Sequence, residues 1–250
     1  MTNHQFSSLP TDPHANSAAS RILRTVLFDL DGTLADTAPD LAYALNCVLQ
    51  QQGRDALPYE VIRPVVSHGG GALISLGFGL GPEHTAFNSL REDLLRIYNE
   101  NLTRDTTLFP GMADLLARLE QRGLNWGVVT NKPSWLTDPL LAQLGLAERA
   151  ACIVSGDTTA NCKPHPESLL HACRLVGSDA GECLYIGDAE RDIEAVRRAG
   201  MLTAVALFGY IDSQDTPGLW GADTLIRHPL DILTWIDTNA HAGMQSGAAP

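Results

Sequence analysis

Lysine is scarce in this sequence, and so is positive charge as a whole. Only two residues are lysines, Lys132 and Lys163, against fifteen arginines, and the formal net charge is −12. A nucleic-acid partner needs a basic surface, which so acidic a chain is poorly placed to assemble. The composition therefore argues against nucleic-acid binding, and it singles out the two loops that carry the lysines.

Long apolar runs are missing as well. The run from Leu202 to Phe208 has the length of a buried strand and is far too short to cross a bilayer. The N-terminal segment is rich in Ser, Asn, Pro and Ala and lacks the basic start and apolar stretch of a secretory signal. We therefore expect no membrane partner, a flexible tail over residues 1–23 and a cytoplasmic protein.

The five cysteines form no C-x-x-C pair of the kind that binds zinc or performs redox chemistry. Their odd number favours free thiols in a reducing compartment. The apolar fraction of 44% and the charged fraction of 18% are close to globular averages. A chain of this length suits one α/β domain, with or without a smaller inserted domain.

Short runs of apolar and β-branched residues alternate with helical patterns along most of the chain. The predicted strands cover residues 24–30, 125–130, 152–155, 183–187, 202–207 and 224–227. The predicted helices between them cover residues 112–121, 135–143, 167–175 and 191–199. Alternation of this kind predicts an α/β fold whose parallel sheet is covered by helices on both faces.

One interval, residues 36–108, interrupts the alternation with amphipathic stretches and glycine-rich turns and no convincing strand. We expect a helical cap there. It would be inserted into a core domain formed by residues 24–35 and 109–240, with a last helix at 229–238 and a tail at 241–250. Because the cap starts directly after the first strand, it should cover the carboxyl ends of the strands, where open α/β sheets bind ligands. A lid in that place can exclude water and select substrates.

Two carboxylates stand at the end of the first predicted strand. Asp29 and Asp31 point to the same side if the backbone is extended, and carboxylates held close together must bind a cation or share a proton. Gly32 then allows a sharp turn out of the sheet. Taken alone, D-x-D-G also fits a calcium loop or a capped turn. The nature of the site therefore depends on the other strand ends.

Polar side chains follow three other strands. Thr130 and Asn131 offer donors suited to phosphate oxygens, although the same segment would serve as a helix N-cap. Lys163 lies in a proline-flanked loop that can aim its ammonium group at an anion, unless it is only a solvated surface lysine. Asp188 directly follows the predicted strand at residues 183–187, and Asp192 lies four residues farther on. Asp192 is equally explained as an acid in the first turn of a helix. Oxygen ligands without His or Cys favour Mg²⁺ over zinc.

The order of these segments resembles one known family. VLFDLDGTL, VVTNKP, CKPHPE and YIGDAERD follow the order of the four motifs of the haloacid dehalogenase-like (HAD) hydrolases, at residues 26–34, 128–133, 162–167 and 185–192. Each motif is weak alone, whereas four in this order on four strand ends are a specific signal. The resemblance extends over residues 24–236. It implies a Rossmann-like parallel-sheet HAD core with an inserted small helical cap.

The resemblance also implies a mechanism. Asp29 would attack phosphorus and form an aspartyl-phosphate, while Asp31 would protonate the departing alkoxide and later activate water. The implied magnesium ligands are Asp29, Asp31 through its backbone carbonyl, and Asp188, with Asp192 in support. The implied phosphate-binding residues are Thr130, Asn131 and Lys163.

Within the superfamily the chain is similar to the phosphoglycolate phosphatase group. Three of its segments, WGVVTNKP, QLGLAERAA and GYI followed by DTPGLWGAD, resemble those of bacterial N-acetylmuramic acid 6-phosphate phosphatases. The resemblance therefore implies hydrolysis of N-acetylmuramic acid 6-phosphate, in peptidoglycan recycling, with 2-phosphoglycolate as the alternative substrate. Nothing in the sequence indicates an oligomeric state.

The inserted cap is expected to select the substrate. Its candidate contacts are Arg63, Ser67, Gly69 and Gly70, because a glycine-rich turn at residues 68–71 lets the backbone approach a ligand closely. The competing interpretation is a flexible link between cap helices.

Three other activities use related chemistry. A signalling receiver domain also phosphorylates an aspartate, but it needs neither a substrate lid nor a D-x-D pair. A haloalkanoic acid dehalogenase has no use for Asp31, because halide leaves without a proton. A sugar-phosphate mutase would transfer the phosphate within the substrate instead of to water. The phosphatase interpretation is favoured over these three.

Overall fold

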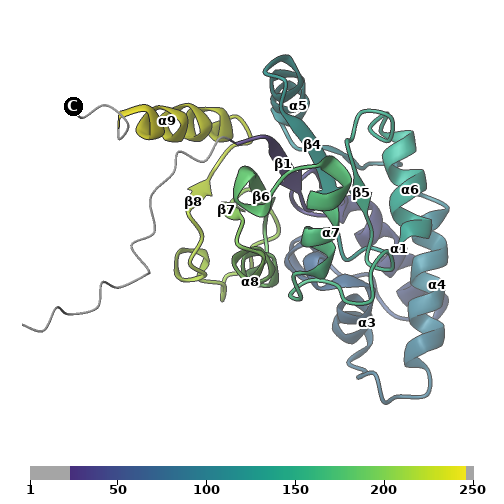
Figure 1. The fold of residues 1–250 in the computed structure, drawn as a ribbon. Helices are drawn as coiled ribbons and strands as arrows, with labels where there is room; N and C mark the ends of the chain where they lie inside the picture. The colour runs from purple at the N-terminus through teal and green to yellow at the C-terminus, as the bar shows by residue number, and fades with distance from the viewer. Residues whose placement is uncertain (1–22, 246–250) are drawn as a thin grey trace, which may run out of the picture.

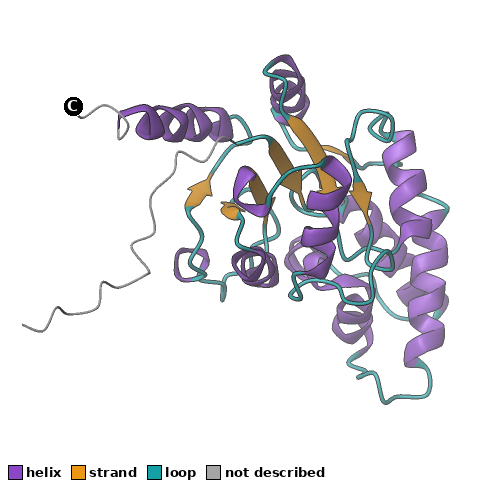
Figure 2. Ribbon diagram, viewed as in Figure 1, coloured by secondary structure: helices purple, strands orange, loops and turns teal. Residues whose placement is uncertain are grey.

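The computed structural model describes residues 23–245 (Figures 1 and 2). Six strands form one sheet in the order β5-β4-β1-β6-β7-β8, and every neighbouring pair is parallel. The strands are β1 (Thr25–Phe28), β4 (Asn125–Val129), β5 (Ile153–Val154), β6 (Cys183–Gly187), β7 (Leu202–Ala206) and β8 (Thr224–Ile226). The parallel α/β fold predicted from the sequence is confirmed.

Helices cover both faces of the sheet, and the alternation of side chains along β1 shows why. Val26 and Phe28 join the larger apolar cluster, to which α5, α6 and α9 contribute, while Leu27 joins a second cluster with α7 and α8. A strand buried on both sides must be apolar throughout, as β1 is. The core helices are α5 (Met112–Gln121), α6 (Ser134–Gln143), α7 (Glu167–Val176), α8 (Glu190–Ala199) and α9 (Asp231–Gln245), with short 3₁₀ helices η2 (Ala180–Glu182) and η3 (Pro217–Leu219).

The chain enters the sheet in its middle. From β1 it proceeds to β4 and β5 on one side and then to β6, β7 and β8 on the other, so the strand order reverses beside β1. Phe28 is in register with Val128 of β4 and Ile186 of β6, which brings the carboxyl ends of the three strands together. Open α/β sheets bind ligands at such a reversal. The residues that directly follow the three strands are Asp29, Thr130 and Asp188.

The segment between β2 (Ala35–Asp36) and β3 (Thr107–Leu108) is mainly helical, and we refer to it as the cap. These two short strands pair antiparallel and hold the entry and the exit of the cap side by side. The cap contains α1 (Ala38–Gln51), α2 (Tyr59–Ile62), the 3₁₀ helix η1 (Arg63–His68), α3 (Gly69–Phe78) and α4 (Phe87–Asn99). Helices α1, α3 and α4 pack together beside the sheet (Figure 1). Their apolar side chains are continuous with the larger core cluster, so cap and core share one interior.

The glycine-rich segment at residues 68–71 begins a helix, and the predicted turn is wrong beyond its first glycine. Gly69 has a φ of +82° where η1 meets α3. The following glycine lies against α4, where a Cβ added to Gly70 would be 3.3 Å from Leu95. Glycine disfavours helices by about 1 kcal/mol relative to alanine. Close packing of α3 on α4 therefore overrides the intrinsic preference on which the sequence prediction relied.

The ends of the chain differ from the sequence expectations in part. Helix α9 continues to Gln245, past residue 238 where the predicted helix ended, because no proline interrupts the segment and two alanines favour the helix. The expected N-terminal tail, apart from residue 23, and residues 246–250 of the expected C-terminal tail lie outside the described residues.

All five cysteines are free, as expected. Within residues 23–245, no helix combines the length and the apolar character that crossing a membrane requires.

A buried carboxylate fastens the cap helix α1 to the segment that returns to the core. Asp40, which is 0% exposed, accepts hydrogen bonds from the backbone N–H of Asp105 at 2.9 Å and of Thr106 at 2.9 Å. The hydroxyl of Thr106 donates a third bond to it at 2.7 Å. One side chain therefore satisfies donors 65 and 66 residues away in the sequence.

Substitution of this carboxylate should destabilise the protein. We expect Asp40→Ala to lower the free energy of unfolding by about 2 to 4 kcal/mol, because two backbone donors lose their charged acceptor. Urea unfolding followed by circular dichroism measures the loss. The matched control is Asp114→Ala, an exposed acid in the first turn of α5, which should cost less than about 1 kcal/mol. Equal losses in the two variants would contradict the role of Asp40.

Candidate functional site

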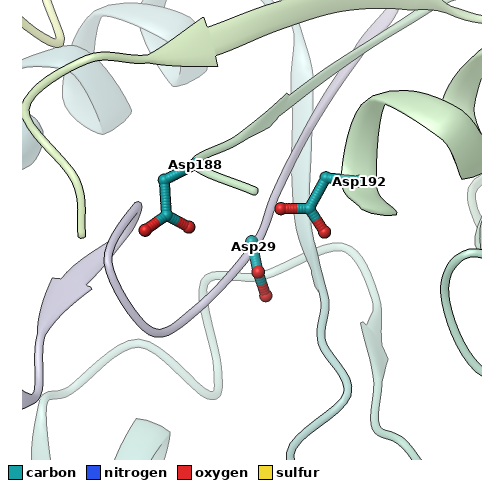
Figure 3. A group of neighbouring side chains, drawn as sticks. All are labelled: Asp29, Asp188 and Asp192. Atoms are coloured by element: carbon teal, nitrogen blue, oxygen red, sulfur yellow. The ribbon is translucent and has the colours of Figure 1, made fainter. Parts of the chain in front are cut away.

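Three buried aspartates meet at the reversal of strand order. Asp29 follows β1, Asp188 follows β6, and Asp192 lies in the first turn of α8. One carboxylate oxygen from each lies within 4.8 Å of those of the other two, and Figure 3 shows the three side chains converging from separate segments. The structure thus brings together acids that are up to 163 residues apart in the sequence.

Burial makes two acids of this cluster, Asp29 and Asp188, costly to ionise. Loss of solvent raises the pKa of Asp29 to about 6 from its ordinary 3.8, and Lys163 opposes the shift while Asp192 adds to it. Burial likewise raises the pKa of Asp188 to about 7, with further increments from Asp29 and Asp192. Carboxylates at such distances repel one another. The site is therefore suited to a cation.

Lys163 is the cation that the fold itself supplies. Its Nζ is 3.0 Å from Asp29 Oδ1 and 2.9 Å from Asp192 Oδ1, and the latter contact is ionic without hydrogen-bond geometry. It also donates at 2.6 Å to the hydroxyl of Tyr185, which donates at 2.8 Å to the backbone carbonyl of Val129. Burial opposes the charge of Lys163, but Asp192 and Asp29 outweigh it and raise the pKa of the ammonium.

The turn after β1 leaves room for Asp188. Gly32 has a φ of +83°, which glycine tolerates, and a Cβ at this position would overlap the Asp188 carboxylate. Asp188 accepts hydrogen bonds from the backbone N–H of Tyr210 at 2.8 Å and from the hydroxyl of the cap residue Ser67 at 2.9 Å. The hydroxyl of Thr33 donates to it more weakly at 3.3 Å. Core and cap together thus fix its orientation.

The side chain of Asp31 has a separate environment. Its Oδ1 accepts hydrogen bonds from Lys132 Nζ at 2.8 Å and from the Thr37 hydroxyl at 2.6 Å. Lys132 also donates to the hydroxyl of the cap residue Tyr98 at 3.0 Å. Burial opposes the charged form of Lys132, yet Asp31 and Tyr98 outweigh it and raise its pKa. The two aspartates of the first motif are therefore each paired with one of the two lysines.

The loop after β4 aligns the other motifs. Asn131 accepts a hydrogen bond from the backbone N–H of Lys163 at 3.0 Å and donates to the Lys163 carbonyl at 2.8 Å. The hydroxyl of Thr130 accepts from the Lys132 N–H at 3.1 Å, which leaves the Thr130 hydroxyl hydrogen free for another acceptor. The amide of Asn131 is thus already engaged with the backbone of Lys163, whereas Thr130 still has a donor to offer.

A cavity of about 320 Å³ lies between cap and core above these residues. Asp29 and Asp31 both line it, as do Thr130 and Asn131. Lys163, Asp188 and Asp192 are not part of its lining and lie buried next to Asp29. A larger depression of about 790 Å³ is lined by residues around α7 and the amino-terminal ends of β1 and β6. None of the clustered aspartates and neither lysine lines it, so the smaller cavity is the candidate active site.

The structure separates the four cap candidates. Ser67, Gly69 and Gly70 line the cavity. Arg63 does not: its guanidinium donates to the carbonyl of Phe208 at 3.1 Å and stacks over the ring of Tyr210.

Sequence reasoning assigned no role to several residues that line the cavity: Lys132, Tyr98, Arg91 and Arg191. Lys132 had one usable signal, because both lysines of the chain lie in motif loops. Arg191 stands within the fourth motif, between the two aspartates. The positions on α4 carried no signal, because their facing partners belong to distant parts of the chain.

Known proteins resemble this chain over most of its length. It is 44% identical over 216 residues to the N-acetylmuramic acid 6-phosphate phosphatase of Pseudomonas putida, covering 86% of this chain and 97% of the relative. It is 44% identical over 209 residues to a phosphoglycolate phosphatase of Xanthomonas campestris pv. campestris, covering 84% and 94%. The crystal structure of a predicted phosphoglycolate phosphatase from Haemophilus somnus superposes with a TM-score of 0.77 at 25% identity, covering 85% and 97%.

The family-level match agrees with the geometry of the site. The family model described as haloacid dehalogenase-like hydrolase matches residues 26–206, which is more than half of the chain and includes all four motifs. The same segment contains both lysines and all three aspartates of the acidic cluster. The chain therefore belongs to the haloacid dehalogenase-like hydrolases and is an enzyme of the phosphatase type, as its four motifs predicted.

Proposed function

We propose that this hydrolase cleaves a phosphomonoester by attack of the Asp29 carboxylate on phosphorus, with Asp31 as the proton donor to the leaving alcohol. The observation that carries the proposal is the arrangement at the end of β1. Both aspartates line one cavity, and the Oδ1 atom of each is held by a buried lysine. The two carboxylates therefore have fixed orientations in front of a space that a substrate can enter.

Asp29 has the properties of an oriented nucleophile. Its Oδ1 accepts a hydrogen bond from the N–H of Leu30 at 2.7 Å and pairs with Lys163. Its Oδ2 accepts no hydrogen bond from any residue that the structure describes, which leaves its lone pairs available. In the proposed reaction the bond from Asp29 to phosphorus forms as the ester P–O bond breaks. Water then attacks phosphorus, which releases phosphate and restores the carboxylate.

Asp31 is placed to move the proton that this reaction requires. Both donors to Asp31, Lys132 and Thr37, bind Oδ1, and across residues 23–245 no donor is bound to Oδ2. We therefore assign the proton to Oδ2, from which it passes to the leaving alkoxide. The same oxygen later takes a proton from the attacking water, so Asp31 ends each cycle in its starting state.

The remaining polar groups would balance charge on the phosphoryl group. Thr130 keeps a hydroxyl hydrogen for a phosphate oxygen, and Lys163 offsets charge from behind Asp29. Asn131 fits a supporting role best, because its amide holds the Lys163 loop in place. Lys132, beside Asp31, adds a second positive charge to the site.

The acidic cluster fits a divalent cation, and we propose Mg²⁺. Asp29 and Asp188 would hold it together with the backbone carbonyl of Asp31, while Asp192, engaged with Lys163, would support the pair. Two observations favour this: the pKa of both Asp29 and Asp188 is raised, and one oxygen from each of the three buried aspartates lies within 4.8 Å of those of the other two. Hard carboxylate oxygens are the ligands that Mg²⁺ prefers. When bound, the cation would supply charge that lets a phosphate dianion approach several carboxylates.

For the substrate we propose N-acetylmuramic acid 6-phosphate, with 2-phosphoglycolate as the second candidate. These are the compounds in the names of relatives at 44% identity. The cavity volume of about 320 Å³ falls within the range of pockets that take ligands much larger than a two-carbon acid. The size of the cavity therefore favours the amino sugar over 2-phosphoglycolate as the substrate.

Loss of the Asp31 carboxyl should separate the two chemical steps. With p-nitrophenyl phosphate, whose phenolate leaves without a proton, Asp31→Asn should release a burst of one nitrophenol per active site, because the first step needs no acid. Turnover after the burst should be at least about 100-fold slower than in the wild type, because no base activates water. Stopped-flow absorbance measures both phases. Asp29→Asn should give neither burst nor turnover while melting as a folded protein. An unchanged steady state in Asp31→Asn would contradict the assignment.

Cation binding should also be visible without turnover. The raised pKa values of Asp29 and Asp188 mean that the cation-free folded protein binds more protons than the unfolded chain between about pH 4 and 7. These two acids therefore reduce stability as the pH rises through that window, and at pH 8 both are charged. Mg²⁺ at about 100 times its dissociation constant should then raise the melting temperature by about 5 to 10 °C.

Two comparisons make this cation test specific. Asp188→Asn should abolish the Mg²⁺-dependent shift and, at pH 8, melt higher than the cation-free wild type, because one buried charge is gone. Excess EDTA should stop turnover by the wild type. A Mg²⁺ shift that persists in Asp188→Asn, or full activity in EDTA, would rule out the proposed cation site.

A further inference from the structure

One face of the cap helix α4 lines the cavity, and its side chains become less buried from Tyr98 to Arg91. Tyr98, Leu95 and Arg91 all line it, and their spacing of three and four residues places them on the same side of the helix. Tyr98 is buried beside Lys132, Leu95 is half-buried, and Arg91 is exposed at the mouth. Seven residues of α-helix span about 10 Å. The guanidinium of Arg91 therefore belongs to the end of the cavity away from the reacting acids.

Arg91 is a cation of this cavity that has no partner among residues 23–245. Lys132 is paired with Asp31, and the guanidinium of Arg191 donates to the backbone carbonyl of Ser67 at 2.6 Å. By contrast, no ion pair, side-chain hydrogen bond or aromatic ring engages Arg91 within the part of the chain that the structure describes. A guanidinium that lines a ligand cavity without a partner is free to form a forked pair with a carboxylate.

We propose that Arg91 binds a carboxylate of the substrate that lies across the leaving group from the phosphate, and that it thereby selects acidic sugar phosphates. This inference rests on the proposed phosphatase function and deepens it. In 2-phosphoglycolate the carboxylate is attached to the carbon that bears the ester oxygen, so it stays near Asp31. In N-acetylmuramic acid 6-phosphate a whole sugar ring separates the phosphate from the lactyl carboxylate, which suits the separation along α4.

The cavity between the two charged ends is suited to a sugar ring. Leu41 and Leu95 come from the cap and Leu136 from α6 of the core, and all three line the cavity. These apolar side chains can cover the C–H face of a ring, while Gly69 and Gly70 leave space beside it. The contact with Arg91 would then act on binding of the leaving group and leave the phosphoryl chemistry to the core.

The experiment compares three substrates on the full-length protein at one Mg²⁺ concentration. N-Acetylmuramic acid 6-phosphate carries the distal carboxylate, N-acetylglucosamine 6-phosphate lacks it, and 2-phosphoglycolate carries a proximal one. We expect Arg91→Met to lower kcat/KM for the first by about 10- to 100-fold, mainly through KM, with little change for the other two. Arg91→Lys should recover part of the loss. Arg118→Met removes an exposed arginine from α5, outside the cavity, and is the matched control.

The outcomes separate this inference from the proposal on which it rests. A loss in Arg91→Met that is equal for all three substrates, or no loss at all, would overturn the role of Arg91 and leave the phosphatase function standing. A wild-type enzyme that prefers 2-phosphoglycolate to the amino sugar would overturn the substrate proposal and this inference together. Melting temperatures of all variants verify that they are folded.

Discussion

The ion pairs of Lys163 with Asp29 and Asp192 are the interactions on which the site depends. Three carboxylates meet in a buried space, where burial and the neighbouring Asp192 raise the pKa of both Asp29 and Asp188. Lys163 lies between two of them, and Tyr185 and the backbone of Val129 orient it in turn. Removal of one partner from such a buried group leaves an uncompensated charge, which is strongly unfavourable. The fold therefore holds an arrangement that is short of positive charge, which the proposed cation would supply.

The division between core and cap follows from this charge balance. The groups that we assign to the reacting phosphate come from strand ends of the core, which the sheet holds in register. The cap contributes contacts at the edge of that arrangement: Ser67 donates to Asp188, and Tyr98 accepts from Lys132. Farther along α4 the wall becomes less buried and ends at Arg91. If the proposed roles hold, chemistry and substrate choice reside on different parts of the chain and can change independently.

Much of the site could be predicted from sequence because it follows local rules. The strands are apolar runs, and the motif residues directly follow them, so alternation and strand ends located Asp29, Thr130 and Asp188 without a structure. Helix α3 was missed because packing on α4 overrides the poor helix propensity of its glycines. The pairing of Lys132 with Asp31 joins residues 101 positions apart. Both residues follow neighbouring strands of the core sheet, β1 and β4, and which side chains meet across such strand ends depends on the tertiary arrangement, which no local pattern encodes.

The central claim is that a carboxylate of the protein, and not water, attacks phosphorus first. The most direct test is the stereochemical course of hydrolysis, measured with a substrate whose phosphorus is chiral through oxygen isotopes. Each in-line displacement inverts the configuration at phosphorus. Transfer to Asp29 followed by transfer to water therefore predicts net retention. Net inversion would mean that water attacks the ester in a single step, and it would contradict the account of this site.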